Sequence, residues 1–401
     1  MKDVITSFLN PKTIALIGAS EKKGKVGYIL MQKLLKSKSK IIPINLKQTQ
    51  ILTKQAYSSV LLYKEKIDLA IIAIPAKTVP QALIECGKKK IQNIIIISAG
   101  FEESGNKKLQ EKLNNIKEKY SLNILGPNCF GIFNPKINLD TTFANTTPKK
   151  GSIAFLSQSG ALWSYIADLD LWFSGFVSLG NMSDLSFTDF LEYFIKDKNT
   201  NKIILYIEKL KQGKKFIELC NSTKKEIIVI KAGKTKQGKE AAISHTASLA
   251  TDYEIYKNAF RQAGVKQVST IQEALNLKQE ELTSELKGKE LFVITNAGGA
   301  GTILTDILTQ KGYKIFGPHD LLGTANANDY KSELNRIRAD YDNILLILTP
   351  QSMSEPSKTA QEIVNFHNRK KIIAIFLGDK SIQDAKRILE LNGIKVFTNL
   401  I

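Results

Sequence analysis

The sequence predicts an α/β protein built from three doubly wound domains. Its strongest pattern is an alternation of short β-branched runs with longer amphipathic segments, which is typical of βαβ units and parallel sheets. The pattern is interrupted twice, by a polar stretch with prolines at 134–150 and by a charged run at 280–289. A length of 401 residues also exceeds one ordinary domain of about 100 to 200 residues. We expect domains at 1–140, 150–284 and 289–401.

Five short apolar runs in the first domain are expected to form strands, with helix-like segments between most of them. These runs are Thr13 to Gly18, Ile41 to Asn45, Leu69 to Ile74, Asn93 to Ile97 and Asn123 to Leu125. Similar runs occur at 152–156, 202–207 and 226–230 in the second domain, and at 290–295, 344–348, 372–376 and 394–397 in the third. The order of elements therefore repeats in all three domains.

Glycine-rich and polar turns follow the strands of the first domain, at the edge where open α/β sheets bind ligands. They are Gly18-Ala19-Ser20 with Gly24 to Gly27, Pro43 to Lys47, Ala73 to Pro75, Ser98 to Phe101 and Gly126 to Gly131. The first turn contains Lys25 but departs from the GxGxxG spacing, so by itself it fits a nucleotide site and a tight structural turn equally well. Several such turns on one edge favour a cofactor crevice.

The other two domains each carry one glycine-containing turn between a strand and a helix. The second domain has Ser157-Gln158-Ser159-Gly160, and the third has Asn296 to Gly301. Unpaired N–H groups at a helix N-terminus bind anions, although capping alone also explains Ser and Gly at such positions. Two helix N-termini from different domains could therefore face one phosphate.

Only one of the three histidines has a context that suggests chemistry. His245 ends a segment rich in Gly, Ala, Ser and Lys (233–245), which we expect to be a loop, whereas His319 and His367 are expected at the surface or at caps. A loop histidine can be a general acid or base, a metal ligand or a phosphoryl acceptor. Metal binding is disfavoured because no partner lies at ligand spacing.

Glu208 follows the expected strand at 203–207. A carboxylate at this edge can hold the second nitrogen of a catalytic imidazole and so fix its tautomer. The alternative is a solvated glutamate at a strand end, which position alone favours.

The bulk properties restrict the class of protein. The lysines behind the net charge of +19 are spread along the whole chain. This spread favours a solvated surface that attracts anionic substrates, and it disfavours a groove for nucleic acid. No run of about 18 apolar residues and no secretion signal is present, so we expect a cytoplasmic protein. Cys86, Cys129 and Cys220 are widely spaced and are expected to be reduced thiols rather than disulfides or zinc ligands.

Taken together, these strings resemble the ADP-forming acyl-CoA synthetases, relatives of the succinyl-CoA synthetases, and most closely the alpha subunits of the acetate–CoA ligases. The resemblance covers nearly the whole chain. It rests on residues 14–20, 126–131, 157–162, 180–181, 206–208, 244–249 and 296–301. It implies an N-terminal Rossmann-like CoA-binding domain followed by two flavodoxin-like domains.

The resemblance also implies the roles of individual residues. The phosphohistidine would be His245, and its supporting carboxylate would be Glu208. Coenzyme A would be bound by Gly18, Ala19, Ser20, Lys25, Val26, Gly27, Asn45, Lys47, Ile74, Pro75, Ser98, Ala99, Gly100 and Asn128. Phosphate and the acyl group would be bound by Ser157, Gln158, Ser159, Gly160, Asn181, Gly299, Ala300 and Gly301.

The implied reaction converts acyl-CoA, ADP and phosphate reversibly into the acid, ATP and CoA, through an acyl phosphate and a phosphohistidine, with acetyl-CoA as the family default. Nothing in the chain resembles an ATP-grasp domain, so we expect a separate ATP-grasp beta subunit that holds ATP or ADP with Mg, in a hetero-oligomer. The chain departs from the family pattern at Leu46, Lys209, Thr251 and Ala300, which affects turn stiffness more than chemistry.

The sequence favours two other functions less. A CoA-binding regulatory or scaffold protein of the same fold is disfavoured because His245 and Glu208 are both retained and no acetyltransferase-like segment is present. A nicotinamide-dependent dehydrogenase is disfavoured because Asn45 and Lys47 stand where the second strand of such enzymes ends in an acidic residue.

Overall fold

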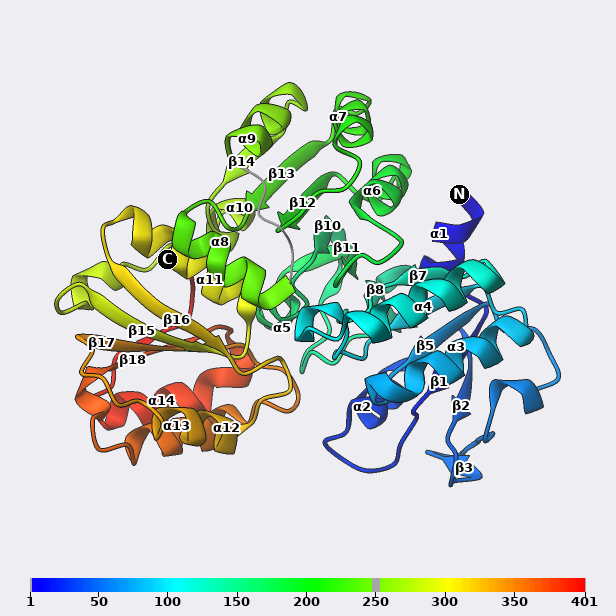
Figure 1. The fold of residues 1–401 in the computed structure, drawn as a ribbon, viewed down its shortest axis with the longest axis horizontal. Helices are drawn as coiled ribbons and strands as arrows, with labels where there is room; N and C mark the ends of the chain where they lie inside the picture. The colour runs from blue at the N-terminus through cyan, green and yellow to red at the C-terminus, as the bar shows by residue number, and fades with distance from the viewer. Residues whose placement is uncertain (1, 247–252, 401) are drawn as a thin grey trace.

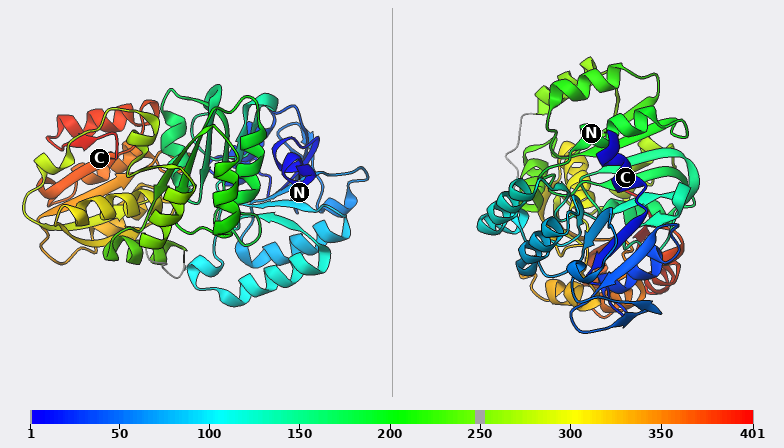
Figure 2. Two further views of the ribbon diagram at one scale, coloured as in Figure 1. Left: turned by 90° about the horizontal axis from the view of Figure 1, so that it is seen from above. Right: turned by 90° about the vertical axis from the view of Figure 1, so that its right-hand side faces the viewer.

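The computed structural model describes residues 2–246 and 253–400, apart from the side chains of residues 2, 3 and 243–246. The chain forms three mainly parallel sheets with helices packed against them (Figure 1). The second sheet lies between the other two along the long axis of the molecule (Figure 2). The expected α/β class with three doubly wound domains is therefore confirmed.

The first sheet has the strand order β2-β1-β5-β6-β7 and is parallel throughout. Its strands are β1 (Thr13–Ile17), β2 (Lys40–Ile44), β5 (Leu69–Ile72), β6 (Asn93–Ile96) and β7 (Asn123–Leu125). The chain passes from β1 to β2 and then returns to the other side of β1 to form β5. This reversal creates a switch point between β1 and β5, the place where open α/β sheets bind ligands.

The second sheet has seven strands in the order β14-β13-β12-β10-β11-β8-β9. They are β8 (Ile132–Asn134), β9 (Leu139–Asp140), β10 (Lys149–Ser157), β11 (Trp172–Ser178), β12 (Lys202–Ile207), β13 (Glu226–Lys231) and β14 (Lys266–Val268). β8 pairs antiparallel with β11. The chain thus enters the second sheet at Ile132, within the range expected for the first domain, and its switch point lies between β10 and β12.

The third sheet repeats the order of the first, as β16-β15-β17-β18-β19. Its strands are β15 (Glu290–Thr295), β16 (Lys314–Asp320), β17 (Asn343–Leu348), β18 (Ile372–Phe376) and β19 (Val396–Phe397). Alternate residues of β15 point to opposite faces, with Leu291 and Val293 in one hydrophobic cluster and Phe292 and Ile294 in another. The switch point here lies between β15 and β17.

The helices connect the strands and cover the faces of the sheets. The longer ones are α1 (Lys2–Leu9), α2 (Val26–Leu34), α3 (Val79–Lys88), α4 (Lys107–Tyr120), α5 (Ala161–Asp168), α6 (Phe187–Lys196), α7 (Gly213–Asn221), α8 (Lys236–Thr246), α9 (Tyr253–Gln262), α10 (Ile271–Leu275), α11 (Gly298–Gln310), α12 (Ala327–Leu334), α13 (Pro356–Val364) and α14 (Gln383–Leu391). One face of the third sheet is covered by α11 together with α8 of the second domain, and the other face by α12 to α14 (Figure 1). Among the described residues, no helix combines the length and the apolar character needed to cross a membrane.

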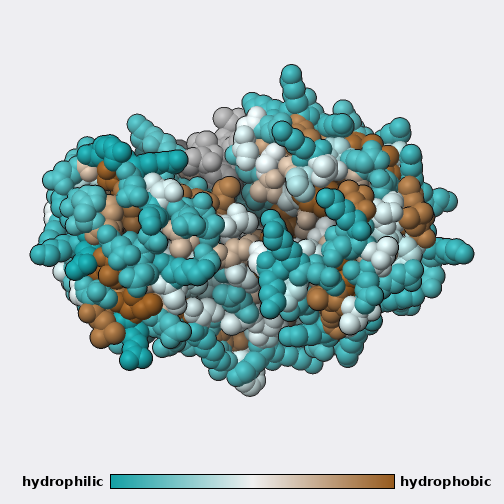
Figure 3. Space-filling model, turned by 90° about the horizontal axis from the view of Figure 1, so that it is seen from below, coloured by the Kyte–Doolittle hydropathy of each residue, from teal (hydrophilic) through white to brown (hydrophobic). Residues whose placement is uncertain are grey.

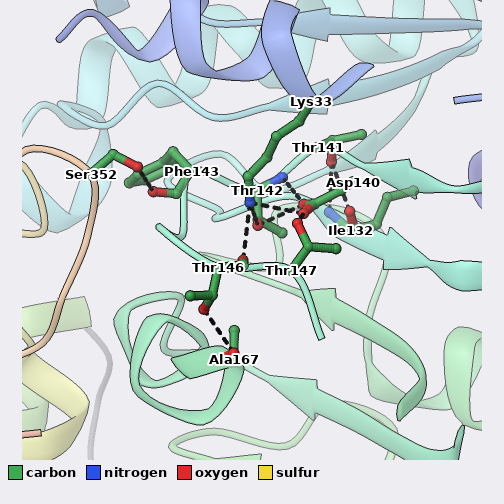
Figure 4. Close-up of polar contacts among 10 residues, drawn as sticks. All are labelled: Lys33, Ile132, Asp140, Thr141, Thr142, Phe143, Thr146, Thr147, Ala167 and Ser352. Carbon is green, nitrogen blue, oxygen red and sulfur yellow. Dashed lines mark hydrogen bonds and ion pairs between the residues drawn. The ribbon is translucent and has the colours of Figure 1, made fainter. Parts of the chain in front are cut away.

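The segment that begins with β9 joins all three domains. Asp140 is buried and accepts hydrogen bonds from Lys33 of α2 (2.8 Å), from the backbone N–H and hydroxyl of Thr142 (2.9 and 2.7 Å) and from the hydroxyl of Thr147 (2.8 Å) (Figure 4). Ser352 of the third domain donates to the carbonyl oxygen of Phe143 through its hydroxyl, at 3.0 Å (Figure 4). The buried polar groups of Asp140 and Thr142 therefore find partners inside the protein.

Candidate active site

A cleft of about 680 Å³ lies where all three sheets present the carboxyl ends of their strands. Gly18 follows β1, Gln158 follows β10 and Asn296 follows β15, and all three residues line the cleft. Seen from below, a pale strip of residues of intermediate hydropathy lies between two lobes whose surfaces are largely hydrophilic, with scattered hydrophobic patches (Figure 3). The remaining lining residues are 19, 20, 22, 25–27, 45, 73–75, 97–99, 103, 104, 128–130, 143, 159–161, 298, 320 and 322–324.

The turn from β1 to α2 is packed too tightly for side chains. Gly18 has a φ of +97°, and a Cβ there would lie 2.3 Å from the carbonyl oxygen of Ala73. A Cβ on Gly27 would lie 1.9 Å from the carbonyl oxygen of Gly18. Lys25 precedes the first residue of α2, and its ammonium has no acceptor with which to cap the helix. The first N–H groups of α2 are therefore positioned for an anion in the cleft.

Asn45 ties the end of β2 to this turn. Its amide group donates to the carbonyl oxygen of Ala19 at 2.8 Å, and its amide oxygen accepts from the backbone N–H groups of Lys47 (2.8 Å) and Gln48 (3.0 Å). Asn45 itself lines the cleft, whereas Lys47 is not among the lining residues. The polar groups of Asn45 thus hold the backbone of the cleft wall.

Glu103 is a cleft residue that the sequence analysis did not single out. One of its carboxylate oxygens accepts from the N–H groups of Gly100 (2.6 Å) and Phe101 (3.2 Å), and the other accepts from the amide of Asn181 at 2.5 Å. The amide oxygen of Asn181 accepts from Asn128 at 3.3 Å. This chain of contacts joins two turns of the first domain to the second domain. The signal for Glu103 in the sequence is an acidic residue three positions after Gly100, the glycine of the turn.

The helix starts of the second and third domains meet in the cleft. A Cβ on Gly299 would lie only 2.5 Å from both Cβ and Oγ of Ser159, and Tyr206 donates through its hydroxyl to the carbonyl oxygen of Gly299 at 3.3 Å. The residues before α5 and α11 are Gly160 and Ala297, which have no polar side chain to cap these helices. The two helix N-termini therefore converge.

Several residues expected around these helix starts also pack or bond within the protein. Ser157 is buried and donates through its hydroxyl to the carbonyl oxygen of Ser159 at 2.7 Å. Ala300 is buried in α11, and a Cβ on Gly301 would lie 3.1 Å from Pro318. Asn181, Gly299, Ala300 and Gly301 are not among the cleft-lining residues.

Glu208 is buried at the carboxyl end of β12 and does not occupy a solvated strand end. The amide oxygen of Gln158 accepts from the backbone N–H groups of Glu208 (2.8 Å) and Lys209 (2.7 Å). The ammonium of Lys231, at the end of the neighbouring strand β13, donates to the carbonyl oxygen of Glu208 at 2.9 Å. Two side chains of the second domain thus fix the backbone at Glu208.

Lys231 is a second residue missed by sequence reasoning. It is 7% exposed and its ammonium lies 4.5 Å from the ring centroid of Tyr256. Burial lowers the pKa of Lys231 to about 8, against the opposing effect of the nearby charges of Glu208 and Asp306.

The prediction of a loop around His245 is wrong, because Lys236–Thr246 form helix α8. The hydroxyl of Thr235 accepts from the N–H of Gly238 at 2.9 Å, which caps the helix, and the residues that follow include good helix formers such as Ala, Lys and Glu. The side chain of His245 lies outside the described residues. His319 and His367 are exposed, as expected.

No group of three metal-ligating side chains occurs among the described residues. The three cysteines are free and buried, and burial raises the pKa of the Cys129 thiol in the cleft wall to about 12. These thiols are accordingly protonated near neutral pH.

Comparisons with known proteins agree with this geometry. Residues 12–135 match the family model of a CoA binding domain, and residues 150–279 match that of the succinyl-CoA ligase like flavodoxin domain. The chain is 38% identical to acetate–CoA ligase [ADP-forming] I of Archaeoglobus fulgidus, over 96% of this chain and 60% of that protein. It therefore spans less than two thirds of that relative.

Two further relatives match over nearly their whole length. The alpha subunit of acetate–CoA ligase [ADP-forming] II of Pyrococcus furiosus is 37% identical over 97% of this chain and 93% of that subunit. The solved structure of a dinucleotide-forming acetyl-coenzyme A synthetase of Ca. Korarchaeum cryptofilum, in complex with phosphate and ADP, has a TM-score of 0.66 and 30% identity, and covers 100% of this chain and 94% of that one. The resemblance noted in the sequence is confirmed: the chain belongs to the family of the ADP-forming acetate–CoA ligases and aligns with their alpha subunits.

Proposed function

We propose that this chain is the CoA-handling, phosphohistidine-bearing alpha subunit of an ADP-forming acyl-CoA synthetase. In this role it converts an acyl-CoA, with acetyl-CoA as the expected substrate, and phosphate into CoA and the free acid, and passes a phosphoryl group to ADP. The observation that carries the proposal is the convergence of two helix N-termini, at Ser159 and Gly299, beside the same cleft that the β1–α2 turn lines.

Coenzyme A fits the end of the cleft formed by the first domain. The N–H groups at the start of α2, with Lys22 and Lys25, suit the phosphates of CoA, because a helix N-terminus and two ammonium groups favour an anion there. The same cleft continues to Ser159 and Gly298, so a thioester could extend from the first domain to the helix starts. The net charge of +19 supports the attraction of such anionic substrates.

Phosphate bound at the two helix starts would attack the carbonyl carbon of the thioester. The new C–O bond forms as the C–S bond breaks, and CoA leaves as a thiolate that takes up a proton. N–H groups pointing at the phosphate neutralise its charge without needing to reorganise during the reaction. The product at this stage is an acyl phosphate.

A ring nitrogen of His245 would then attack the phosphorus, and the bond from phosphorus to the acyl oxygen would break, releasing the carboxylate of the acid. The carboxylate of Glu208 would stabilise the imidazolium. The burial of Glu208 and the fixation of its backbone by Gln158 and Lys231 support this role.

Transfer of the phosphoryl group to ADP is assigned to an ATP-grasp beta subunit that binds the nucleotide with Mg. The names of the alpha-subunit relatives support such a two-subunit enzyme. The predicted cytoplasmic location is part of the same proposal, and the three free thiols support it because reducing compartments preserve thiols.

Phosphohistidine formation can be tested on the chain alone with acetyl phosphate radiolabelled at phosphorus. Wild-type protein should acquire acid-labile label, His245→Asn should acquire none, and Glu208→Gln should label at least about 100-fold more slowly, the range found when an interaction that stabilises charge in a transition state is lost. His319→Asn is the control histidine variant and should label normally. Absence of label on the wild-type chain would favour a CoA-binding protein without turnover.

A further inference from the structure

We propose that Asp306 is a positioning residue that anchors the N-terminal end of α8 and thereby sets where position 245, at the other end of that helix, can reach. The inference rests on the proposed function of His245. Asp306 belongs to α11 in the third domain, whereas the segment it holds belongs to the second. Asp306 is 4% exposed.

The carboxylate of Asp306 is bonded only to the residues that lead into α8, as far as the described contacts show. One oxygen accepts from the N–H groups of Gly233 (2.7 Å) and Lys234 (3.0 Å), and the other accepts from the N–H (2.8 Å) and the hydroxyl (2.9 Å) of Thr235. A buried carboxylate is tolerated when its acceptor capacity is filled in this way. Its negative charge at the start of α8 also interacts favourably with the positive end of the helix dipole.

The first turn of α8 is built directly on this carboxylate. Thr235 caps the helix through its hydroxyl, which accepts from the N–H of Gly238, and a Cβ on Gly238 would lie 1.9 Å from a carboxylate oxygen of Asp306. Gln237 adds two contacts to the third domain, donating to the carbonyl oxygen of Ile315 (3.2 Å) and accepting from the hydroxyl of Thr309 (2.9 Å). The start of α8 is thus fixed to the third domain.

The opposite end of α8 extends toward the cleft. α8 contacts the turn Glu102–Ser104, two residues of which line the cleft. With a rise of about 1.5 Å per residue, α8 spans roughly 14 Å between Lys236 and position 245. The same rise places Asp306 roughly 12 Å along α11 from Gly298, the residue at the proposed phosphate site. One helix, α11, therefore carries both the phosphate-binding start and the anchor of the histidine helix.

This arrangement means that Asp306 acts on the reaction only through the position of α8. Small displacements of a reacting group, of about 1 Å, can reduce a rate by about 100-fold. Asp306→Asn should release α8, because an amide has only one acceptor oxygen and would point its own N–H groups at a donor. We expect labelling of His245 by acetyl phosphate to slow by about 10- to 100-fold, with CoA affinity unchanged.

Asp168 provides a matched control for this experiment. It is also buried, and it also accepts bonds across the interface of the second and third domains, from the N–H groups of Asp379 (2.8 Å) and Ser381 (3.0 Å) and the hydroxyl of Ser381 (2.6 Å). None of these donors belongs to α8. Asp168→Asn should therefore lower the melting temperature to an extent similar to Asp306→Asn but leave the labelling rate unchanged.

Hydrogen exchange of the amides at 236–242 gives a readout that is independent of the chemistry. Exchange should accelerate in Asp306→Asn and remain at the wild-type rate in Asp168→Asn. If Asp306→Asn does not fold, Thr235→Val serves as a milder variant, with a loss of about 10-fold in labelling expected from a smaller displacement.

Labelling of Asp306→Asn at the wild-type rate, or an equal loss in Asp168→Asn, would overturn the proposal. Wild-type protein that fails to label at all would contradict the proposed function instead, and faster exchange at 236–242 in Asp306→Asn would still identify the anchor.

Discussion

At the scale of single residues, the site depends on positions where an added atom would overlap a neighbour or where the loss of a charge would leave a buried group without its partner. Gly299 is the clearest case, because its missing side chain allows α11 to touch Ser159 and Tyr206. Sequence patterns identified this glycine as part of a helix start, but they could not indicate that it packs against the second domain. That contact depends on the orientation of two domains, which no local pattern encodes.

Gly299→Ala should separate the two helix starts. The new methyl group would overlap Ser159 at 2.5 Å, and relieving such overpacking costs about 1 to 3 kcal/mol of stability. We expect a lower melting temperature and a loss of labelling by acetyl phosphate of at least about 10-fold, since a shift of a fraction of an ångström already weakens a positioned site. Gly213→Ala, at the open first position of α7, is the control and should leave both values unchanged.

Lys231 gives a prediction in pH. Its pKa is lowered from 10.5 to about 8 in the folded protein, so between these two values the unfolded chain binds more protons. The stability of the wild type relative to Lys231→Met should therefore rise with pH from 8 to 10.5, by at most about 3 kcal/mol, and stay constant below pH 8. Urea denaturation of both proteins across this range checks the prediction. A stability difference between the two proteins that does not change with pH would contradict the lowered pKa of Lys231.

At the scale of elements, composition predicted the strands and helix starts well, but it misjudged the segment around His245 and did not indicate the contacts made by the stretch at 134–150. The polar stretch at 134–150 interrupts the pattern of strands and helices, yet its Asp140 and Thr142 are buried and bonded to each other, and the exposed Thr147 also donates to Asp140. The segment around His245 has few bulky apolar residues and so resembles a loop, yet Thr235 and Asp306 cap it as a helix. In both segments, polar groups that a sequence assigns to solvent find partners inside the protein.

The Asp140 cluster, formed by Asp140, Lys33, Thr142 and Thr147, should hold the first and second domains together. Asp140→Ala leaves the partly buried ammonium of Lys33 without its carboxylate, and breaking an ion pair in this way costs at most about 3 to 5 kcal/mol, the range for a fully buried pair. We expect a large fall in melting temperature. The control is Glu65→Ala, which breaks the exposed pair with Lys40 and should change stability little. Equal effects of the two variants would mean that the Asp140 cluster does not join the domains.

At the scale of the whole molecule, three domains whose five parallel strands share one order place their switch points around a common cleft. The paired residues at these points are Gly18 with Ala73, Gln158 with Glu208 and Asn296 with Thr349, and each pair is in contact. The repetition of strands and turns predicted three such edges from the sequence, and the family resemblance predicted their joint use. Glu103, Lys231 and Asp306 were not predicted, because their roles depend on contacts between elements that are distant in sequence.

The most direct test of the proposed function follows the release of CoA and the phosphorylation of His245 in one reaction. The chain is incubated with radiolabelled phosphate, with and without unlabelled acetyl-CoA, and label on the tryptic peptide 240–257 and free CoA thiol are measured together. We predict label on His245 only when acetyl-CoA is present, with one thiol released for each phosphoryl group bound. Thiol release without label, or label that does not depend on acetyl-CoA, would contradict a single site that joins thioester, phosphate and histidine.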